Sequence, residues 1–173
     1  MFATIYLPNF YLQAACRHQA ELTRQPVALI DDQEAKAVII QLNQPAEDLG
    51  VRIGMTPSQG LARSLALKVK TRLRTQEKLL DELLLQFACS LAPYVEATAP
   101  GVATVQFTNR KNIFRDVERV LAQLEETGIN AQAAIAPTPD VSFLAAHLAR
   151  PILAVDEAKD FLAPLPIETL ALA

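Results

Sequence analysis

The side chains most able to bind a metal ion are the acidic residues Asp31, Asp32 and Glu34, which stand close together in the sequence. Carboxylates grouped in this way supply the oxygen ligands that divalent cations prefer. The group, however, joins two short runs rich in β-branched residues, 26–31 and 36–42, and this pattern predicts a β-hairpin. Acidic residues in hairpin turns usually face water, so we expect a solvated tip rather than a metal site.

The other side chains able to do chemistry are isolated or lack the spacing that a site requires. His18 and His147 have no neighbouring cysteine or histidine at the spacing of a metal site, and Cys16 and Cys89 match neither a zinc motif nor a CxxC motif. We expect these residues to be ordinary helix or packing residues. The glycine-rich segment 49–57 lacks the spacing of known phosphate-binding loops, so it predicts a tight turn between two helices.

The element that would have to position a catalytic metal is the first strand. Residues 2–7 form a short, mostly apolar run, and the Pro8-Asn9 pair predicts the end of the strand and the start of a helix. In many α/β enzymes the end of a central strand carries the catalytic carboxylates and metal ions. Here the strand ends in Tyr6 and Leu7 before the proline, and none of these residues can hold magnesium.

The remaining pattern predicts a mixed α+β fold. Outside the segment from residue 9 to about residue 91, the order is strand, strand pair, helix, strand and helix, which predicts a ferredoxin-like sheet with helices packed on one face. The predicted helices are 9–21, 45–50, 56–64, 76–91, 113–127 and 139–149, and the predicted strands are 2–7, 26–31, 36–42, 67–73, 94–98, 102–108 and 129–136. The apolar segment 161–173 has no closing element, so we expect the natural protein to continue beyond Ala173.

Composition argues against two classes of binding surface. The chain has 173 residues, a net charge of −3 and a pI near 5.4, so no overall positive field favours nucleic acid or an anionic membrane. No apolar run approaches the roughly 20 residues that a membrane span needs. The hydrophobic content of 51% is enough for a proper core, and two distant cysteines suit a reducing compartment. We expect a cytoplasmic protein without membrane contact.

Four stretches, taken in order, resemble the amino-terminal part of a Y-family (translesion) DNA polymerase. They are Phe10-Tyr11 after the first strand, Pro26-Val-Ala-Leu29, Leu49-Gly-Val-Arg-Ile-Gly-Met-Thr-Pro57, and Ala136-Pro-Thr-Pro-Asp140 followed by Phe161-Leu-Ala-Pro-Leu-Pro166. The resemblance covers nearly the whole chain, and its most specific part is the glycine-rich corner of the fingers. It implies a palm-like domain at 1–8 and 67–166, a fingers-like insertion at 9–66, and the start of a missing thumb region at 167–173.

The chain departs from this family at the positions where catalysis takes place. In the family, an aspartate on the first strand and an Asp-Glu pair at the palm hairpin hold two Mg²⁺ ions, and the matching positions here are Tyr6, Gly101 and Val102. The triphosphate-binding tyrosine and arginine fall near Gln44 and Glu47, and no lysine matches the one expected after the last palm strand. A carboxylate repels phosphate, and phosphoryl transfer depends on metals and cations. We therefore predict no catalytic, cofactor-binding or metal-binding residue and no enzymatic activity.

This pattern is similar to the ImuB-like subgroup, whose members keep the polymerase fold without the metal site and serve in bacterial damage-induced (SOS) mutagenesis. The resemblance implies a non-catalytic adaptor. In the full-length protein it would recruit the sliding clamp, an ImuA-like RecA-related protein and a separate error-prone polymerase, with weak or indirect DNA binding and no cofactor. Tyr11 matches the family's sugar-discriminating aromatic residue, and we expect it to serve only in packing here.

Two other functions stay open. One is an active DNA-directed nucleotidyltransferase whose metal ligands have moved to Asp31, Asp32 or Glu96, the last of which lies on the strand leading into the predicted palm hairpin. The other is a ferredoxin-like binding or dimerisation domain unrelated to DNA, which the acidic pI suits, because a fold does not determine a function. The basic stretch 68–74 is expected to be a solvated strand face rather than a nucleic-acid contact.

Overall fold

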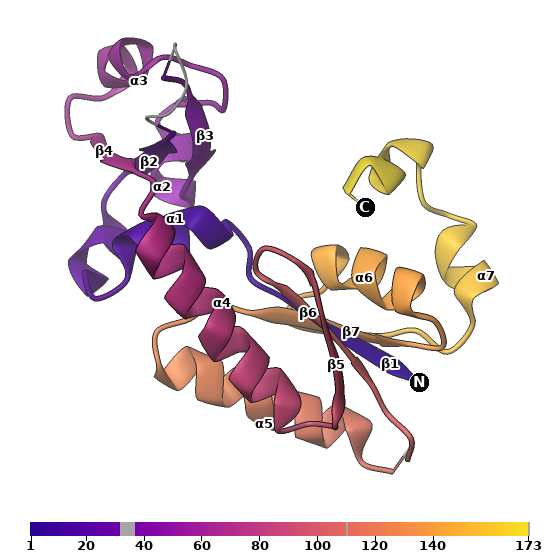
Figure 1. The fold of residues 1–173 in the computed structure, drawn as a ribbon. Helices are drawn as coiled ribbons and strands as arrows, with labels where there is room; N and C mark the ends of the chain where they lie inside the picture. The colour runs from indigo at the N-terminus through magenta and orange to yellow at the C-terminus, as the bar shows by residue number, and fades with distance from the viewer. Residues whose placement is uncertain (32–36, 110, 173) are drawn as a thin grey trace. The chain divides into compact units, whose positions relative to one another are not determined.

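The computed structural model describes residues 1–31, 37–109 and 111–172, which form two compact units (Figure 1). Unit 1 comprises Met1–Pro8 and Asp81–Ala173, and unit 2 comprises Asn9–Leu80. Each unit has its own β-sheet. The predicted palm-like domain included residues 67–80, which group with unit 2 in the structure. Along the described parts of the chain, no helix is both long and apolar enough to cross a membrane.

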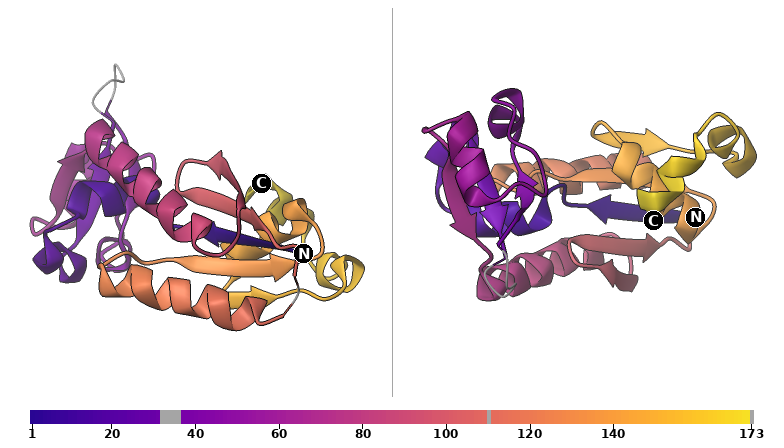
Figure 2. Two further views of the ribbon diagram at one scale, coloured as in Figure 1. Left: turned by 60° about the horizontal axis from the view of Figure 1, so that its bottom comes forward. Right: turned by 90° about the horizontal axis from the view of Figure 1, so that it is seen from above.

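The sheet of unit 1 is built around the first strand. Its strands are β1 (Phe2–Tyr6), β5 (Tyr94–Ala99), β6 (Val102–Gln106), β7 (Gln132–Ala136) and β8 (Ile152–Ala154), in the order β5-β6-β1-β7-β8. Strand β1 is antiparallel to both β6 and β7, whereas β8 runs parallel to β7. Figure 2 shows β1, in indigo, with strands on either side. The three middle residues of β1 are fully buried, which explains why its sequence lacks charged side chains.

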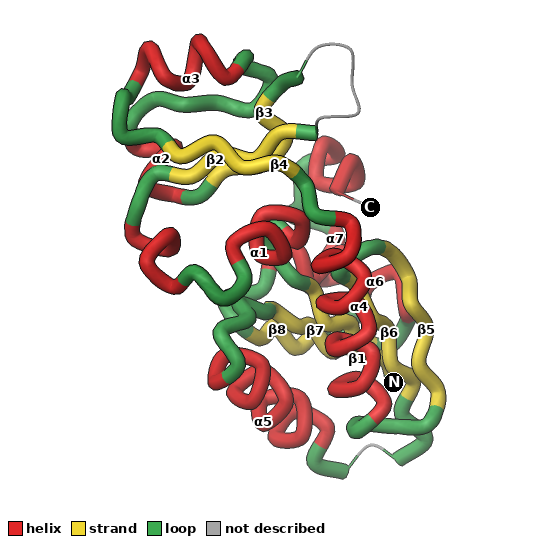
Figure 3. The backbone as a smooth tube through the Cα atoms, turned by 60° about the vertical axis from the view of Figure 1, so that its left-hand side comes forward, coloured by secondary structure: helices red, strands yellow, loops and turns green. Residues whose placement is uncertain are grey.

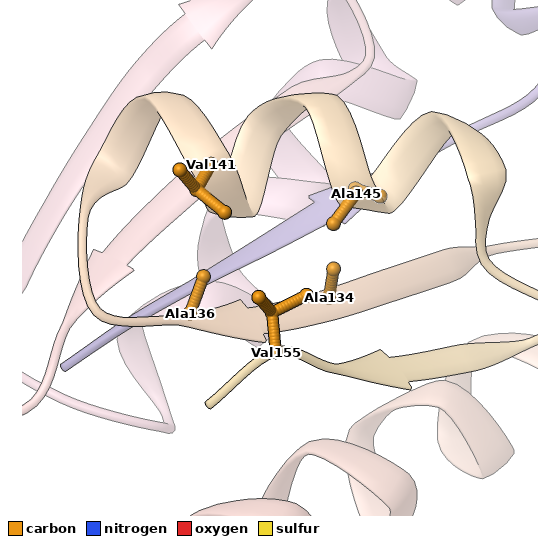
Figure 4. Packing of buried hydrophobic residues seen from close by; sticks show 6 residues of the cluster. Ala134, Ala136, Val141, Ala145 and Val155 are labelled. Carbon is orange, nitrogen blue, oxygen red and sulfur yellow. The ribbon is translucent and has the colours of Figure 1, made fainter. Parts of the chain in front are cut away.

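The helices of unit 1 cover both faces of this sheet. They are the part of α4 (Arg74–Cys89) from Asp81 onward, α5 (Ile113–Glu126), α6 (Pro139–Leu148) and α7 (Ala158–Leu162), followed by the 3₁₀ helix η2 (Ile167–Leu172). Figure 4 shows Val141 and Ala145 of α6 pointing onto Ala134, Ala136 and Val155, with another helix beyond the sheet. The predicted α+β class is confirmed, but α6 lies on the face opposite to α5, not on the same face. Side chains of a strand alternate between faces, so both faces of this sheet can be apolar.

The sheet of unit 2 has three strands in the order β3-β2-β4 (Figure 3). Strands β2 (Val27–Ile30) and β3 (Ile39–Leu42) are antiparallel, as the predicted hairpin requires, and β4 (Lys68–Thr71) runs parallel to β2. The helices are α1 (Phe10–Cys16), α2 (Gln44–Asp48) and α3 (Pro57–Arg63), with the 3₁₀ helix η1 (Ala20–Arg24) after α1.

One side chain, Asn43, joins several elements of unit 2. Its Oδ1 accepts hydrogen bonds from the backbone N–H groups of Val27 at 2.9 Å and Ala46 at 3.2 Å, and its Nδ2 donates to the Gln25 carbonyl at 2.7 Å. Asn43 therefore caps α2 and also fixes the start of β2. Asparagine suits this position because its amide both accepts and donates hydrogen bonds.

Several predicted boundaries differ from the structure for local reasons. The predicted helix 9–21 ends at Cys16, because His18 takes a left-handed conformation with φ of 69° before η1 begins. Asn112 was predicted to cap α5, but it also has a positive φ, of 62°, and its side chain makes no capping hydrogen bond. Strand β8 and helix α7 were not predicted, because each is very short.

Candidate functional site

The three palm positions Tyr6, Gly101 and Val102 lie side by side in unit 1. Tyr6 and Val102 are paired in the register of β1 and β6. The backbone N–H of Leu7 donates to the carbonyl of Gly101 at 2.9 Å, which ties the end of β1 to the β5–β6 turn. Gly101 has φ of 73°, a left-handed conformation that favours glycine in a tight turn. The structure therefore brings together residues that are far apart in the sequence.

Tyr6 packs against aromatic side chains of α6. Its ring stacks on the ring of His147, with centroids 4.1 Å apart, and the His147 ring in turn contacts Phe143 at 4.7 Å. The Nδ1 atom of His147 lies 2.9 Å from the Phe143 carbonyl oxygen. A carbonyl oxygen only accepts hydrogen bonds, so this bond requires the tautomer in which Nδ1 carries the proton. Burial raises the pKa of the Tyr6 phenol above its usual range. Sequence reasoning missed this role of His147, because no local pattern links it to Tyr6.

These positions do not fit the two Mg²⁺ ions that the resemblance implies. Tyr6 offers a neutral phenol, Gly101 has no side chain, and the isopropyl group of Val102 is buried. The nearby Asp81 accepts a hydrogen bond from the backbone N–H of Gly101 at 2.8 Å, and Glu96 is exposed on β5. Within the described ranges, no three histidine, cysteine, aspartate or glutamate side chains gather as metal ligands would. Magnesium needs carboxylate oxygens in octahedral geometry, which this arrangement does not provide.

A chain of hydroxyl groups crosses the sheet beneath α6. Thr98 donates to Thr104 at 2.7 Å, Thr104 lies 3.1 Å from Thr4, and Thr4 lies 2.7 Å from Ser142. The Ser142 hydroxyl donates to the Pro139 carbonyl at 2.8 Å. Thr4, Thr104 and Ser142 are buried, and each finds a partner, so the cost of removing their hydroxyls from water is offset. The chain joins β5, β6, β1 and α6 through neutral groups.

The two predicted triphosphate positions are exposed on α2. The Gln44 side chain donates to Asp48 at 2.8 Å, and Glu47 faces solvent. Among the described residues, Arg52 is the positively charged side chain nearest to Glu47 in the sequence. Its Nη1 donates to the carbonyl oxygens of Glu47 at 2.7 Å and Val51 at 2.8 Å. Arg52 thus satisfies carbonyls at the end of α2. The predicted tight turn is instead a longer connection, because residues 49–56 separate α2 from α3.

A second polar cluster, the Arg72 cluster, lies in unit 2. The Arg72 guanidinium donates to both oxygens of Glu77, at 2.9 and 2.6 Å, and to Asp31 at 3.2 Å, while Arg74 contacts Asp31 at 2.8 Å. The guanidinium carbon also lies 3.7 Å from the centroid of the Tyr11 ring. Hydrogen bonding to Glu77 raises the pKa of Arg72 above its usual range. The guanidinium is therefore fixed between two carboxylates and one aromatic face.

This cluster corrects two predictions. Asp31 was expected in a solvated tip, but its side chain is only 12% exposed because it pairs with Arg72 and Arg74. The same pairing removes Arg72 from the solvated face expected for the basic stretch 68–74. Asp32 and Glu34 lie outside the described residues. Tyr11 packs as predicted, with Phe10 edge-on at 5.3 Å and Arg72 over its face.

The fold matches solved structures of DNA polymerases. The post-insertion binary complex of Dbh DNA polymerase is 17% identical in sequence with a TM-score of 0.85, and covers 97% of this chain and 52% of its own. The crystal structure of DinB from Sulfolobus solfataricus is 16% identical with a TM-score of 0.83, with coverage of 97% and 52%. The insertion ternary complex of Dbh DNA polymerase is 15% identical with a TM-score of 0.84, with coverage of 97% and 53%. The chain spans about half the length of these proteins, and at such identity the matches establish the fold alone.

The sequence itself matches a family model over most of its length. No curated protein matches the chain, but the model described as the impB/mucB/samB family matches residues 5–147. These findings overturn the prediction that the chain is not an enzyme, because the matched fold and family are those of DNA polymerases and the chemistry of Tyr6, Gly101 and Val102 does not demonstrate inactivity. The chain belongs to the impB/mucB/samB family, the Y-family DNA polymerases.

Proposed function

We propose that this chain is the palm and fingers part of a cytoplasmic adaptor protein in translesion DNA synthesis and damage-induced mutagenesis. The observation that supports the proposal is the Tyr6–His147 stack at the end of β1, because the resemblance implies a metal-binding carboxylate where Tyr6 stands. The scaffold around it keeps the Y-family fold. A role in which the surfaces of the fold bind partner proteins fits such a chain better than a role in which Tyr6, Gly101 and Val102 hold metal ions. An adaptor role is compatible with polymerase activity, and the two are measured separately.

The proposed partners are those of the translesion machinery. They are the sliding clamp, an ImuA-like RecA-related protein and a separate error-prone polymerase, all bound by the full-length protein. Direct binding of DNA would be weak, because the net charge is −3 and the cations Arg72 and Arg74 are engaged by Asp31. Affinity for the primer-template would then come mainly through the clamp.

The alternatives gain no support from the described residues. A metal site moved to Asp31 conflicts with its pairing to Arg72 and Arg74, and Asp32 lies outside the described residues. Glu96 is exposed and belongs to no group of metal ligands in the described part of the chain. A binding domain unrelated to DNA is disfavoured by the family match.

Reconstitution tests the adaptor role. Purified full-length protein is combined in turn with the sliding clamp, the ImuA-like RecA-related protein and the error-prone polymerase, and complex formation is followed by size-exclusion chromatography with light scattering. Lesion bypass by the separate error-prone polymerase is then measured with and without the full-length protein. We expect a stable complex and increased bypass. Primer extension by the full-length protein alone is the control that measures its own synthesis. A protein that binds none of the three partners and leaves bypass unchanged would contradict the proposal.

A further inference from the structure

A groove lies on unit 1 between the second half of α5 and the start of β8. Figure 3 shows where α5 and β8 lie in the fold. Its volume is about 530 Å³. The floor is formed by the buried side chains of Leu121, Ile129 and Ala131, and one wall by Pro151 and Ile152. The groove is therefore apolar at its base.

Two further features border this groove. Gly128 ends α5 with φ of 77°, and a methyl group added there would meet no atom within 4 Å. Strand β8 stands last in the strand order of the sheet and, among the described residues, pairs only with β7. An edge strand offers backbone hydrogen-bonding groups to a further segment, so the wall at Ile152 suits an extended peptide.

The rim of the groove on α5 is acidic. Glu118 and Glu125 line it and are separated by seven residues, which places them roughly 10 Å apart along one side of the helix. The last turn of α5 carries no basic residue, so the negative end of the helix dipole adds to these carboxylates. Arg119 does not line the groove and pairs with Asp116 at 3.2 Å. The groove thus combines an apolar floor with a negative rim.

We propose that this groove binds a segment of a partner protein that carries aliphatic side chains flanked by lysine or arginine residues about 10 Å apart. The aliphatic side chains would cover Leu121 and Ile129, and the basic residues would pair with Glu118 and Glu125. Charge complementarity selects this occupant over an acidic or a purely apolar segment. The inference goes beyond the adaptor role, and it rests only on residues of α5, β8 and the turns beside them.

The probe is a fluorescein-labelled peptide of leucine and lysine, titrated with the chain by fluorescence anisotropy. Two comparison peptides replace every lysine with glutamate or every leucine with serine. We expect saturable binding of the leucine-lysine peptide and at least about tenfold weaker binding of both comparison peptides. Failure of the leucine-lysine peptide to bind, or equal binding of the serine peptide, would overturn the proposal.

Variants then locate the binding. The double substitution Glu118→Lys and Glu125→Lys should weaken binding of the leucine-lysine peptide by about tenfold or more. The same substitution should strengthen binding of the leucine-glutamate peptide. The charge-matched control is Glu96→Lys with Glu168→Lys, two exposed positions away from the groove, which should change the affinity by less than about twofold. Equal weakening by both pairs would mean general attraction to an acidic protein and would refute a specific groove.

Filling the groove gives an independent measurement. Ala122 is exposed and lines the groove, so the indole of an Ala122→Trp variant should occupy the groove. This variant should weaken binding of the leucine-lysine peptide by about tenfold or more without a change of charge. Gln123 is the matched control, because it is also exposed on α5 but does not line the groove, and Gln123→Trp should leave the affinity unchanged. Unaltered binding by the Ala122→Trp variant would also refute the proposal.

Discussion

Replacing Arg72 with methionine tests the importance of the Arg72 cluster for the stability of unit 2. The guanidinium makes a two-pronged contact with Glu77, contacts Asp31, and covers the Tyr11 ring. Its side chain is 13% exposed. Methionine keeps most of the aliphatic volume but removes the positive charge and all of the hydrogen bonds.

The magnitude follows from what the substitution leaves behind. Removing one partner of a buried ion pair costs about 3–5 kcal/mol, because the other charge stays uncompensated. Here Arg74 lies 2.8 Å from Asp31 and 3.7 Å from Glu77, so it still compensates part of the charge. Arg74 is 47% exposed, and water screens its contribution. We therefore expect Arg72→Met to lower the free energy of unfolding by about 2–3 kcal/mol, below the full cost of an isolated buried charge.

Equilibrium unfolding in urea, followed by circular dichroism, measures this change. The control is Arg119→Met, because Arg119 also contacts a carboxylate but is 58% exposed, and we expect a loss below about 0.5 kcal/mol. Arg72→Lys adds a second comparison, since lysine keeps the charge but not the planar fork, and should fall between the other two variants. If Arg72→Met is within about 0.5 kcal/mol of the unsubstituted chain, the cluster contributes no net stability and our reasoning is wrong.

Three further predictions concern single side chains. Asn43→Ala should destabilise unit 2 by about 2 kcal/mol in the same urea experiment, because it removes the cap of α2 and leaves backbone groups at the start of β2 without their partner. Because burial raises the pKa of Tyr6, the unfolded chain loses this proton before the folded chain does, so stability is unaffected by Tyr6 below pH 10 and falls as the pH rises from 10 through the raised pKa. The unsubstituted chain should therefore lose stability relative to Tyr6→Phe above pH 10. Burial raises the pKa of the Cys16 thiol, although Lys70 partly lowers it, so iodoacetamide at pH 8 should label the exposed Cys89 first, as peptide mass spectrometry would show.

Local signals in the sequence predicted the elements that local interactions fix. Thr56-Pro57 predicted the start of α3, and the structure has a full capping box there, with Thr56 and Gln59 bonded to each other's backbone. Pro100-Gly101 predicted the hairpin of β5 and β6, and Gly101 adopts the positive φ that its turn needs. Such signals act within a few residues, so a single sequence contains them completely.

The sequence could not predict pairings between distant residues. Asp31 looked like a turn residue because nothing nearby in the sequence shows that Arg72, the residue after β4, approaches it. His147 looked isolated because its partner, Tyr6, is far from it in the sequence. In both cases the side chain's environment depends on strand order and on which face a helix covers. Those two properties are set by the packing of the whole unit rather than by local pattern.

The neutral groups at the palm end of β1 depend on one another. A carboxylate in place of Tyr6 would face the ring of His147 and the buried surface of α6, where a charge without a partner is costly. The metal ions that would compensate such a charge need two further carboxylates, and Gly101 and Val102 supply none. The aromatic stack at Tyr6 and the absence of acidic residues in the opposite turn are therefore consistent with each other. A carboxylate introduced at Tyr6 alone would therefore lack the metal ions that compensate such a charge.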